Sequence, residues 1–576
     1  MSNDFIILIF FYFFSAISTL GYGFFIKKIL VPKNISLDYG TTGLVGFFGL
    51  TIYSYLSHFL VAHDLIHNTF IFLIGVIFFL IFYKSELKKN DFKITCLIFI
   101  VLLVAFFCFK THDDFPYYHF PYTNYLTKFD LIVGVGNHDP SWRSPSSIFY
   151  FNSLFYLPFI KYHLYHIGAL LIMAFSLSIL CIKILERYNL KKYDEIFFYK
   201  LLSVSFILIF FYRLSEHGTD RSAQILSFIL ILEILYFFKK EQNFIKFSSK
   251  IFIIGSLAIS LKVFYFIYLI LLIPIFHFIY KDKNSSYFFE IFKNKFFYLS
   301  ILFLFFVTSV NFLNSGCLAY PLTALCFENF NWSIPLSEVD RMRFHYENWS
   351  KSGAGPNFAV TNINENIAYF NWLPGWIEKY FFNKVSDYIL GLITMSIIFF
   401  GVFFKNKKNN KKNLNINLLY IVLIILFIEW FYNHPALRYG GYYIIAILFF
   451  IPLSKILSNY TNESHFKTRV ICIIILSTTI FFYRNIDRIT KEYKQYNYSP
   501  IKTVFYEVNK KKHFRIEKAF NETLDFYKNC TKKKIDCKNE NKLLAHKKYG
   551  KFIFVRSSKF TIEEYKGKTY LQKKKE

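Results

Sequence analysis

The stretch from residue 111 to residue 150 carries side chains that could do chemistry. It lies between two apolar parts of the chain and reads THDDFPYYHFPYTNYLTKFDLIVGVGNHDPSWRSPSSIFY. Its acidic residues, histidines and arginine are Asp113, Asp114, Asp130, Asp139, His112, His119, His138 and Arg143. The adjacent Asp113 and Asp114 come where the preceding apolar run ends, so they would meet water at a membrane boundary. Carboxylates placed there suit a general base, whereas an ordinary loop would carry them as ionised surface groups.

Three later segments add polar side chains of complementary kinds. The further candidates are Glu216, His217 and Asp220 in RLSEHGTDR (213–221), Lys262 within an apolar run, and Arg438 with Tyr439 in HPALRYGGYY (434–443). Carboxylates suit a general base or a divalent cation, whereas Arg and Lys suit a phosphate group. A site that held both kinds would fit a lipid-phosphate substrate and an acceptor that must lose a proton.

The composition places these residues in a membrane protein. Of the 576 residues, 54% are hydrophobic and 22% aromatic, and several apolar runs reach the roughly 20 residues that a bilayer requires. We therefore predict an all-α polytopic transmembrane bundle. The formal net charge of +29 could indicate nucleic acid. Most of that charge lies in short loops and in the C-terminal tail, where membrane topology and anionic lipids explain it, so no nucleic-acid partner is expected.

Lys and Arg are enriched in cytoplasmic loops, so their positions in the short loops assign each loop to one side of the membrane. This predicts about 14 spans, with both chain ends and all the polar candidates outside the cytoplasm. The predicted parts are membrane helices (1–110), an extracytoplasmic acidic loop (111–162), membrane helices (163–313), an extracytoplasmic loop (314–384), membrane helices (385–483) and a small mixed α/β extracytoplasmic tail (484–576). If 251–280 crosses only once, or if 148–160 crosses, the later loops change sides.

Lys262 lies near the middle of the apolar run 251–280. In one straight helix its ammonium would reach the bilayer centre, at a cost of at least roughly 2.5–3.5 kcal/mol. We therefore expect the helix to break at Lys262, giving two short arms that meet at a polar surface.

Cysteine spacing gives a separate expectation. Cys317 and Cys326 lie close together in one outside segment, and Cys530 and Cys537 in the tail, so each pair could form a short-loop disulfide. CxxC spacing is absent, which disfavours zinc. P-loop, GxGxxG and HExxH signatures are also absent from the sequence, which leaves nucleotide-driven and zincin chemistry unsupported.

The order of these features resembles the GT-C superfamily of polytopic glycosyltransferases, which use polyprenyl-phosphate sugars. The acidic pair opens the first large outside loop, and a later outside turn carries Glu216 and Asp220 before a span. GSLAISLKVFYFIYLILLIP (255–274) resembles that superfamily's Gly-rich half-helix, Lys and Leu-rich half-helix ending in Pro. Arg438 and Tyr439 resemble its Arg-Tyr before one of the last spans. The chain departs in having three extra spans before the acidic loop, which indicates a divergent bacterial branch.

The resemblance implies an inverting sugar transfer on the outer face of the inner membrane, from a polyprenyl-phosphate carrier to a lipid or glycan acceptor. Asp113 or Asp114 would be the general base. The residues implied to bind substrate are Arg143, Glu216, His217, Asp220, Lys262, Arg438 and Tyr439, with Lys262 and Arg438 on the phosphate. A divalent cation, Mg or Mn, could be held by Asp113, Asp114, His112 and His138. Tyr117, Tyr118 and Trp142 could stack on sugar rings, or serve only as interfacial aromatics.

Other interpretations stay open. Arg438 could anchor a helix end in the headgroups, and Glu216 and Asp220 could cap a helix through its dipole. A transporter or flippase of lipid-linked saccharides predicts ionisable residues spread through the membrane depth and an internal repeat. A polymerase of surface polysaccharide would share the carrier substrate but rely on outside arginines and histidines.

Overall fold

The computed structural model describes most of the chain. The described residues are 3–32, 35–86, 88–108, 114–214, 219–281, 286–355, 362–404, 416–461, 465–496, 499–502, 504–505, 544–549 and 552–557. His112, Asp113, Glu216, His217, Cys530 and Cys537 lie outside these ranges.

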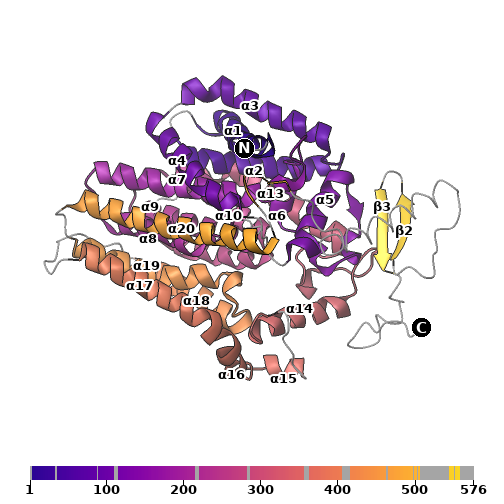
Figure 1. Cartoon of the computed structure of the whole chain (residues 1–576). Coiled ribbons are helices and arrows are strands. Elements are labelled where there is room, and N and C mark those ends of the chain that lie inside the picture. Colours follow the sequence, from indigo (N-terminus) through magenta and orange to yellow (C-terminus); the bar gives the residue numbers. More distant parts are fainter. Residues whose placement is uncertain are drawn as a thin grey trace.

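Most of the described chain is helical (Figure 1). The helices are α1 (Asn3–Leu30), α2 (Tyr39–His58), α3 (Leu65–Glu86), α4 (Lys89–Phe106), α5 (Phe120–Lys128), α6 (Ser147–Ser153), α7 (Ile167–Asn189), α8 (Glu195–Phe210), α9 (Thr219–Phe238), α10 (Phe244–Leu261), α11 (Leu272–Lys281), α12 (Ser286–Lys293), α13 (Lys295–Ser315), α14 (Leu336–Lys351), α15 (Ile363–Ile367), α16 (Leu373–Trp376), α17 (Ser386–Phe403), α18 (Asn417–Asn433), α19 (Gly441–Asn459) and α20 (Phe466–Tyr496).

Ten helical segments of the described chain are long and apolar enough to cross a membrane. They are Asn3–Leu30, Leu65–Glu86, Tyr162–Asn189, Thr219–Phe238, Phe244–Leu261, Val263–Lys281, Lys295–Ser315, Leu373–Phe403, Gly441–Asn459 and Phe466–Lys494. The chain is thus a multi-pass helical membrane protein, as its composition predicted. α2, α4, α8 and the shorter apolar α18 also cover predicted spans but are not among the ten, so the larger span number stays a prediction. The stretch 148–160, which would have changed the sides of the later loops, contains most of α6. This helix has seven residues, too few to cross a bilayer.

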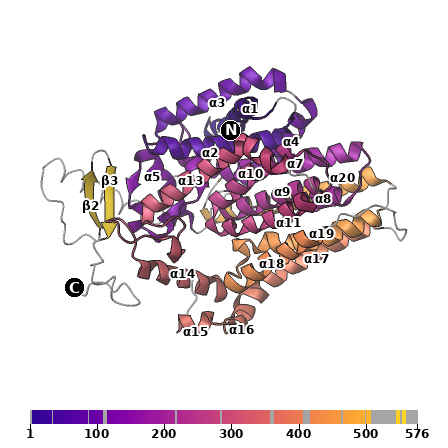
Figure 2. The ribbon, with the colours of Figure 1, turned by 180° about the vertical axis from the view of Figure 1, so that it is seen from behind.

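The long helices lie side by side (Figures 1 and 2). Several of the shorter elements lie beyond one end of them. α5, α14 and the strands lie at that end (right in Figure 1). We call it the polar end, because the acidic loop and the long segment after α13 belong to it.

The first three helices pack with their backbones in contact. A Cβ atom added to Gly21 of α1 would lie 1.9 Å from the Gly75 carbonyl oxygen in α3, and one added to Gly46 of α2 would lie 1.9 Å from the Thr19 carbonyl oxygen. Glycine is therefore required at both crossings, as is common where membrane helices approach closely.

Lys262 interrupts the helical run as the sequence predicted. α10 ends at Leu261, Lys262 has an extended backbone (φ −158°, ψ 125°), and a 3-10 helix at Val263–Leu271 leads into α11. The break places the Lys262 side chain at the polar end instead of within a continuous helix.

The segment after α13 is stabilised by a disulfide bond. Cys317 and Cys326 are joined, which confirms the predicted pairing. Cys317 packs with Tyr320, Ile334, Val339 and Met342 in a small core separate from the membrane helices.

The described tail residues form a hairpin of β2 (Leu544–Tyr549) and β3 (Phe552–Ser557), and β3 pairs in parallel with β1 (Ile132–Val133). Because β1 lies within the acidic loop (111–162), this pairing places the hairpin at the polar end.

Gly21→Ala should lower the thermal stability of the protein, since the new methyl group meets a backbone oxygen that cannot move aside. Overpacking of this kind costs about 1–3 kcal/mol. Gly255→Ala in α10 is the matched control, because a Cβ there has no atom within 4 Å. The melting temperatures of both variants are measured on the detergent-solubilised proteins, with size-exclusion chromatography as the readout of the folded fraction. Equal melting temperatures for the two variants would contradict the helix contact.

Candidate functional site

Four charged side chains from distant parts of the sequence form a chain of ion pairs at the polar end. Asp220 accepts a hydrogen bond from Lys262 Nζ on Oδ1 and one from Arg438 Nε on Oδ2, the latter 2.9 Å long. Arg438 Nη2 also lies 3.2 Å from Asp114 Oδ2. The order is therefore acid, base, acid, base: Asp114, Arg438, Asp220 and Lys262. We call these residues the charge chain.

Each member stands where a helix begins or is interrupted. Asp220 is in the first turn of α9, and Asp114 immediately precedes a π-helical turn at Phe115–His119. Lys262 occupies the break after α10. Arg438 lies in a short 3-10 turn at Leu437–Tyr439, which Gly440 ends with a φ of 103° before α19 begins. Charged groups at helix ends can reach water, so the charge chain lies at the boundary of the apolar bundle.

Gln224 holds two of these elements together. Its Nε2 donates to the Arg438 carbonyl oxygen (3.1 Å), and its Oε1 accepts from the Tyr443 backbone N–H (2.9 Å). The sequence analysis did not single out Gln224. The available signal was its spacing, because it lies four residues after Asp220 and so on the same face of α9.

Two aromatic rings flank the cations. Lys262 Nζ lies 4.1 Å from the centre of the Tyr439 ring, and the Arg438 guanidinium lies 5.7 Å from the rings of Tyr439 and Trp349. Contacts of this kind stabilise a partly desolvated cation. Trp349 comes from α14 and was not among the predicted site residues.

The charge chain is most open at Asp114. The exposed fraction of the side chain rises from 11% for Asp220 to 28% for Arg438 and 33% for Asp114. Asp220 is thus the interior carboxylate shared by two cations, whereas Asp114 can meet a molecule that arrives from solvent.

Protonation states follow from these surroundings. Burial alone would lower the pKa of Arg438, but the charges of Asp220 and neighbouring groups raise it well above its ordinary value. Burial raises the pKa of Tyr439 to about 12, although Arg438 acts in the opposite direction. At neutral pH the site therefore holds a charged guanidinium and a neutral phenol.

The structure places the predicted site residues in two groups. Asp114, Asp220, Lys262, Arg438 and Tyr439 come together. Asp220 and Arg438 form an ion pair with each other, in addition to any role at a helix end. His112, Asp113, Glu216 and His217 lie outside the described residues.

Arg143, which the resemblance implied to bind substrate, does not join the charge chain. Its guanidinium is buried and bonds to Glu338 Oε1 (3.2 Å), to the Tyr320 hydroxyl (2.7 Å) and to the Gly136 carbonyl oxygen (3.3 Å). Of these three partners, Glu338 attracts the guanidinium most strongly, because its carboxylate can neutralise the buried positive charge.

The residues beside Arg143 are structural as well. The Trp142 ring is fully buried among Tyr122 and Tyr125, so it cannot stack on a sugar. His138 lies beside Trp142, and Asp139 accepts a hydrogen bond from the Ser141 backbone N–H. The side chain of Tyr117 lies outside the described part.

Two of the four residues predicted to hold a divalent cation, His112 and Asp113, lie outside the described part of the chain. Among the described residues, no three His, Cys, Asp or Glu side chains group closely enough to hold a metal ion. Asp114 and Asp220 are bridged by Arg438 instead, which already places positive charge between the two carboxylates.

Comparison with known proteins shows the family of the chain. A family model described as a domain of unknown function (DUF8201) matches residues 5–445. The chain belongs to the DUF8201 family. The matched region includes the whole charge chain and Trp349. No curated protein and no solved structure matches the chain.

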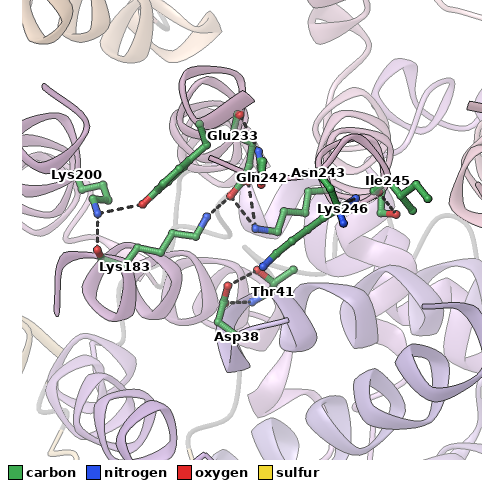
Figure 3. Close-up of polar contacts among 12 residues, drawn as sticks. Asp38, Thr41, Lys183, Lys200, Glu233, Gln242, Asn243, Ile245 and Lys246 are labelled. Carbon is green, nitrogen blue, oxygen red and sulfur yellow. Dashed lines mark hydrogen bonds and ion pairs between the residues drawn. The ribbon is translucent and has the colours of Figure 1, made fainter. Parts of the chain in front are cut away.

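This DUF8201 protein has a second cluster of charged side chains, farther along α9 than Asp220, and Figure 3 shows its polar contacts. Glu233 of α9 is fully buried and pairs with Lys183 of α7 and with Lys250 of α10, the latter at 3.1 Å. Lys200 of α8 donates to the Lys183 carbonyl oxygen and to the Tyr236 hydroxyl. Glu233 lies 13 residues after Asp220, or about 20 Å along α9.

The charged residues of this second cluster were not among the predicted site residues. The signal was the presence of Lys183, Lys200 and Glu233 inside three predicted spans. A buried charge requires a partner, so these residues indicated a buried polar cluster without showing which side chains would pair.

His434 gives a pH-dependent prediction. Burial, with help from Lys351 and Lys262, lowers the pKa of His434 to about 4. The unfolded chain therefore binds the proton more readily, and this group contributes stability that is complete above pH 6.5 and is lost as the pH falls toward 4. The loss is at most about 3 kcal/mol. His434→Gln should melt with a flatter pH profile than the wild type between pH 6.5 and 4.5, and parallel profiles would contradict the assignment.

Proposed function

We propose that this DUF8201 protein is a glycosyltransferase that moves a sugar from a polyprenyl-phosphate carrier to a cell-envelope acceptor. The reaction would occur at the outer face of the bacterial inner membrane, with the polar end facing the periplasm. The observation that carries the proposal is the charge chain. Its partly exposed carboxylate and its two cations meet at one end of the membrane helices.

The cations would bind the phosphate of the carrier. Arg438 offers a planar guanidinium and Lys262 a point charge, and both are groups that recognise phosphate. Asp220 keeps the two cations near each other when no phosphate is present. The apolar arms on either side of Lys262 would lie beside the polyprenyl chain.

Asp114 would act as the general base. It would accept the proton of the acceptor hydroxyl as the acceptor oxygen forms a bond to the anomeric carbon of the sugar. The bond between that carbon and the phosphate oxygen breaks, and its electron pair stays on the polyprenyl phosphate. One displacement of this kind inverts the anomeric centre. Asp113, the adjacent carboxylate in the sequence, is the alternative base.

Asp114→Asn should reduce sugar transfer by about 10²–10⁴-fold, because an amide cannot take the proton. Mass profiling of the surface glycans and lipids of the native host should show the same missing sugar in this variant as in a deletion strain. Asp387→Asn is the matched control, since Asp387 is exposed in the first turn of α17. Protein levels are measured in parallel.

Each outcome of this experiment has a meaning. If Asp113→Asn loses sugar transfer while Asp114→Asn keeps full activity, Asp113 is the general base instead of Asp114. A changed glycan profile on deletion, with both Asp variants active, would make the acidic pair structural and favour a polymerase or flippase. An unchanged profile on deletion would remove sugar transfer as the function.

A flippase of lipid-linked saccharides is the second candidate, and the buried cluster around Glu233 favours it. A flippase needs polar groups at more than one depth to move a charged headgroup, and α9 carries Asp220 and Glu233 about 20 Å apart. In reconstituted vesicles, Glu233→Gln would stop the movement of lipid-linked sugar by a flippase. In a transferase the same change would lower only the yield of folded protein.

A further inference from the structure

Residues 315–355, which include the disulfide and α14, reach across the polar end to the charge chain. We call this segment the outer arm. Glu338 is near the start of α14 and Trp349 is near its end, 11 residues later, or about 16 Å along the helix. The arm is held at both ends of α14.

The first attachment is the ion pair of Arg143 with Glu338. Both side chains are buried, and Glu338 also receives hydrogen bonds of 2.6 and 2.8 Å from Arg341. The disulfide-bonded core of Cys317 and Tyr320 packs against the same turn of α14. This end of the helix therefore cannot shift without breaking a buried ion pair, a change that costs several kcal/mol.

The second attachment is Lys351, at the last turn of α14. Its side chain is fully buried, its Nζ lies 2.6 Å from Glu347 Oε1, and it donates to the Ile367 carbonyl oxygen. The rings of Tyr432 and Trp372 lie 4.9 and 5.6 Å from the ammonium group. Residues from three parts of the chain thus fix the end of the helix.

Between these attachments, Trp349 is presented to the charge chain in one orientation. Its Nε1 donates to the Gly355 carbonyl oxygen (3.0 Å), so the polar edge of the indole is occupied within the arm. Its ring lies 5.8 Å from that of Tyr439 at an angle of 61°, and beside Arg438. Both rings are partly exposed. Two aromatic surfaces therefore stand next to the two cations that would bind a phosphate.

We propose that Trp349 and Tyr439 form the subsite for the sugar ring of the carrier-linked substrate, and that Trp349 determines specificity for it. This inference rests on the proposed function. The C–H groups of a pyranose carry partial positive charge, and the face of an aromatic ring carries the opposite sign. A sugar joined directly to a phosphate on Lys262 and Arg438 would lie within reach of both rings. The outer arm acts here as the element that positions Trp349.

The test compares carriers with and without a sugar. Undecaprenyl phosphate is measured alone and bearing glucose, mannose or arabinose, and binding to the purified full-length protein is followed by native mass spectrometry. The wild type should bind at least one sugar-bearing carrier more tightly than undecaprenyl phosphate. Trp349→Leu should weaken that binding by 10-fold or more while it changes the affinity for undecaprenyl phosphate by less than twofold.

Two further variants separate recognition from folding. Trp349→Phe keeps an aromatic face and should stay within about threefold of the wild type, in line with the modest free energy of one aromatic contact. Trp332→Leu is the matched control, because this tryptophan belongs to the same arm and packs on Phe312 and Phe330 instead of the charge chain. It should leave all four affinities unchanged.

The failures are distinguishable. If the wild type binds none of the four lipids, the proposed function is wrong. If it binds undecaprenyl phosphate and the three sugar carriers equally, or if Trp349→Leu weakens all four to the same extent, the phosphate site stands and the sugar subsite is wrong. A Trp349→Phe variant as weak as Trp349→Leu would also overturn the subsite, since aromatic character would then not matter.

Discussion

The polar end depends on one shared carboxylate. Asp220 offers one oxygen to Lys262 and the other to Arg438, and these cations come from a broken helix and from the turn before α19. Neither cation could sit at the edge of an apolar bundle at low cost without a partner, because ion desolvation costs several kcal/mol. Asp220 therefore determines which helix ends meet, and Asp114 joins them through Arg438.

The helix that carries Asp220 also carries Glu233, so α9 links two charged regions at different depths. Near one end it supports a partly exposed site, and near the other it neutralises two buried lysines. Gln224 lies between them on α9, and its side chain bonds to the backbone of Arg438 and to the backbone of Tyr443. One helix thus aligns the core of the bundle with the site, which explains why its polar side chains are buried against neighbouring helices.

Arg143 illustrates how residue type alone can mislead. An arginine in an acidic loop is as suitable for a phosphate as Arg438 is, and the sequence offers no means of ranking them. In the structure Arg143 is neutralised by Glu338 and buried, whereas Arg438 remains partly exposed beside a partly exposed carboxylate. The distinction is made by what each guanidinium meets, and Arg143 is left with an indirect role through the outer arm.

The sequence by itself determined the membrane class, the break at Lys262 and the possibility of a Cys317–Cys326 bond. It also predicted one shared side for a larger set of polar residues, which included Arg143 and did not separate Asp114 from Asp113. These follow from local rules: apolar length, the cost of a buried ammonium, short loop closure, and the tendency of charges to share one side of a membrane. Only the tertiary structure decided that Arg143 is structural, that Trp142 is buried, and that Trp349, Gln224 and the Glu233 cluster matter. Several of these outcomes depend on contacts between residues far apart in the sequence: 50 positions for Lys183 with Glu233, 195 for Arg143 with Glu338 and 219 for Gln224 with Tyr443. Sequence periodicity carries no information about which distant side chain becomes the partner.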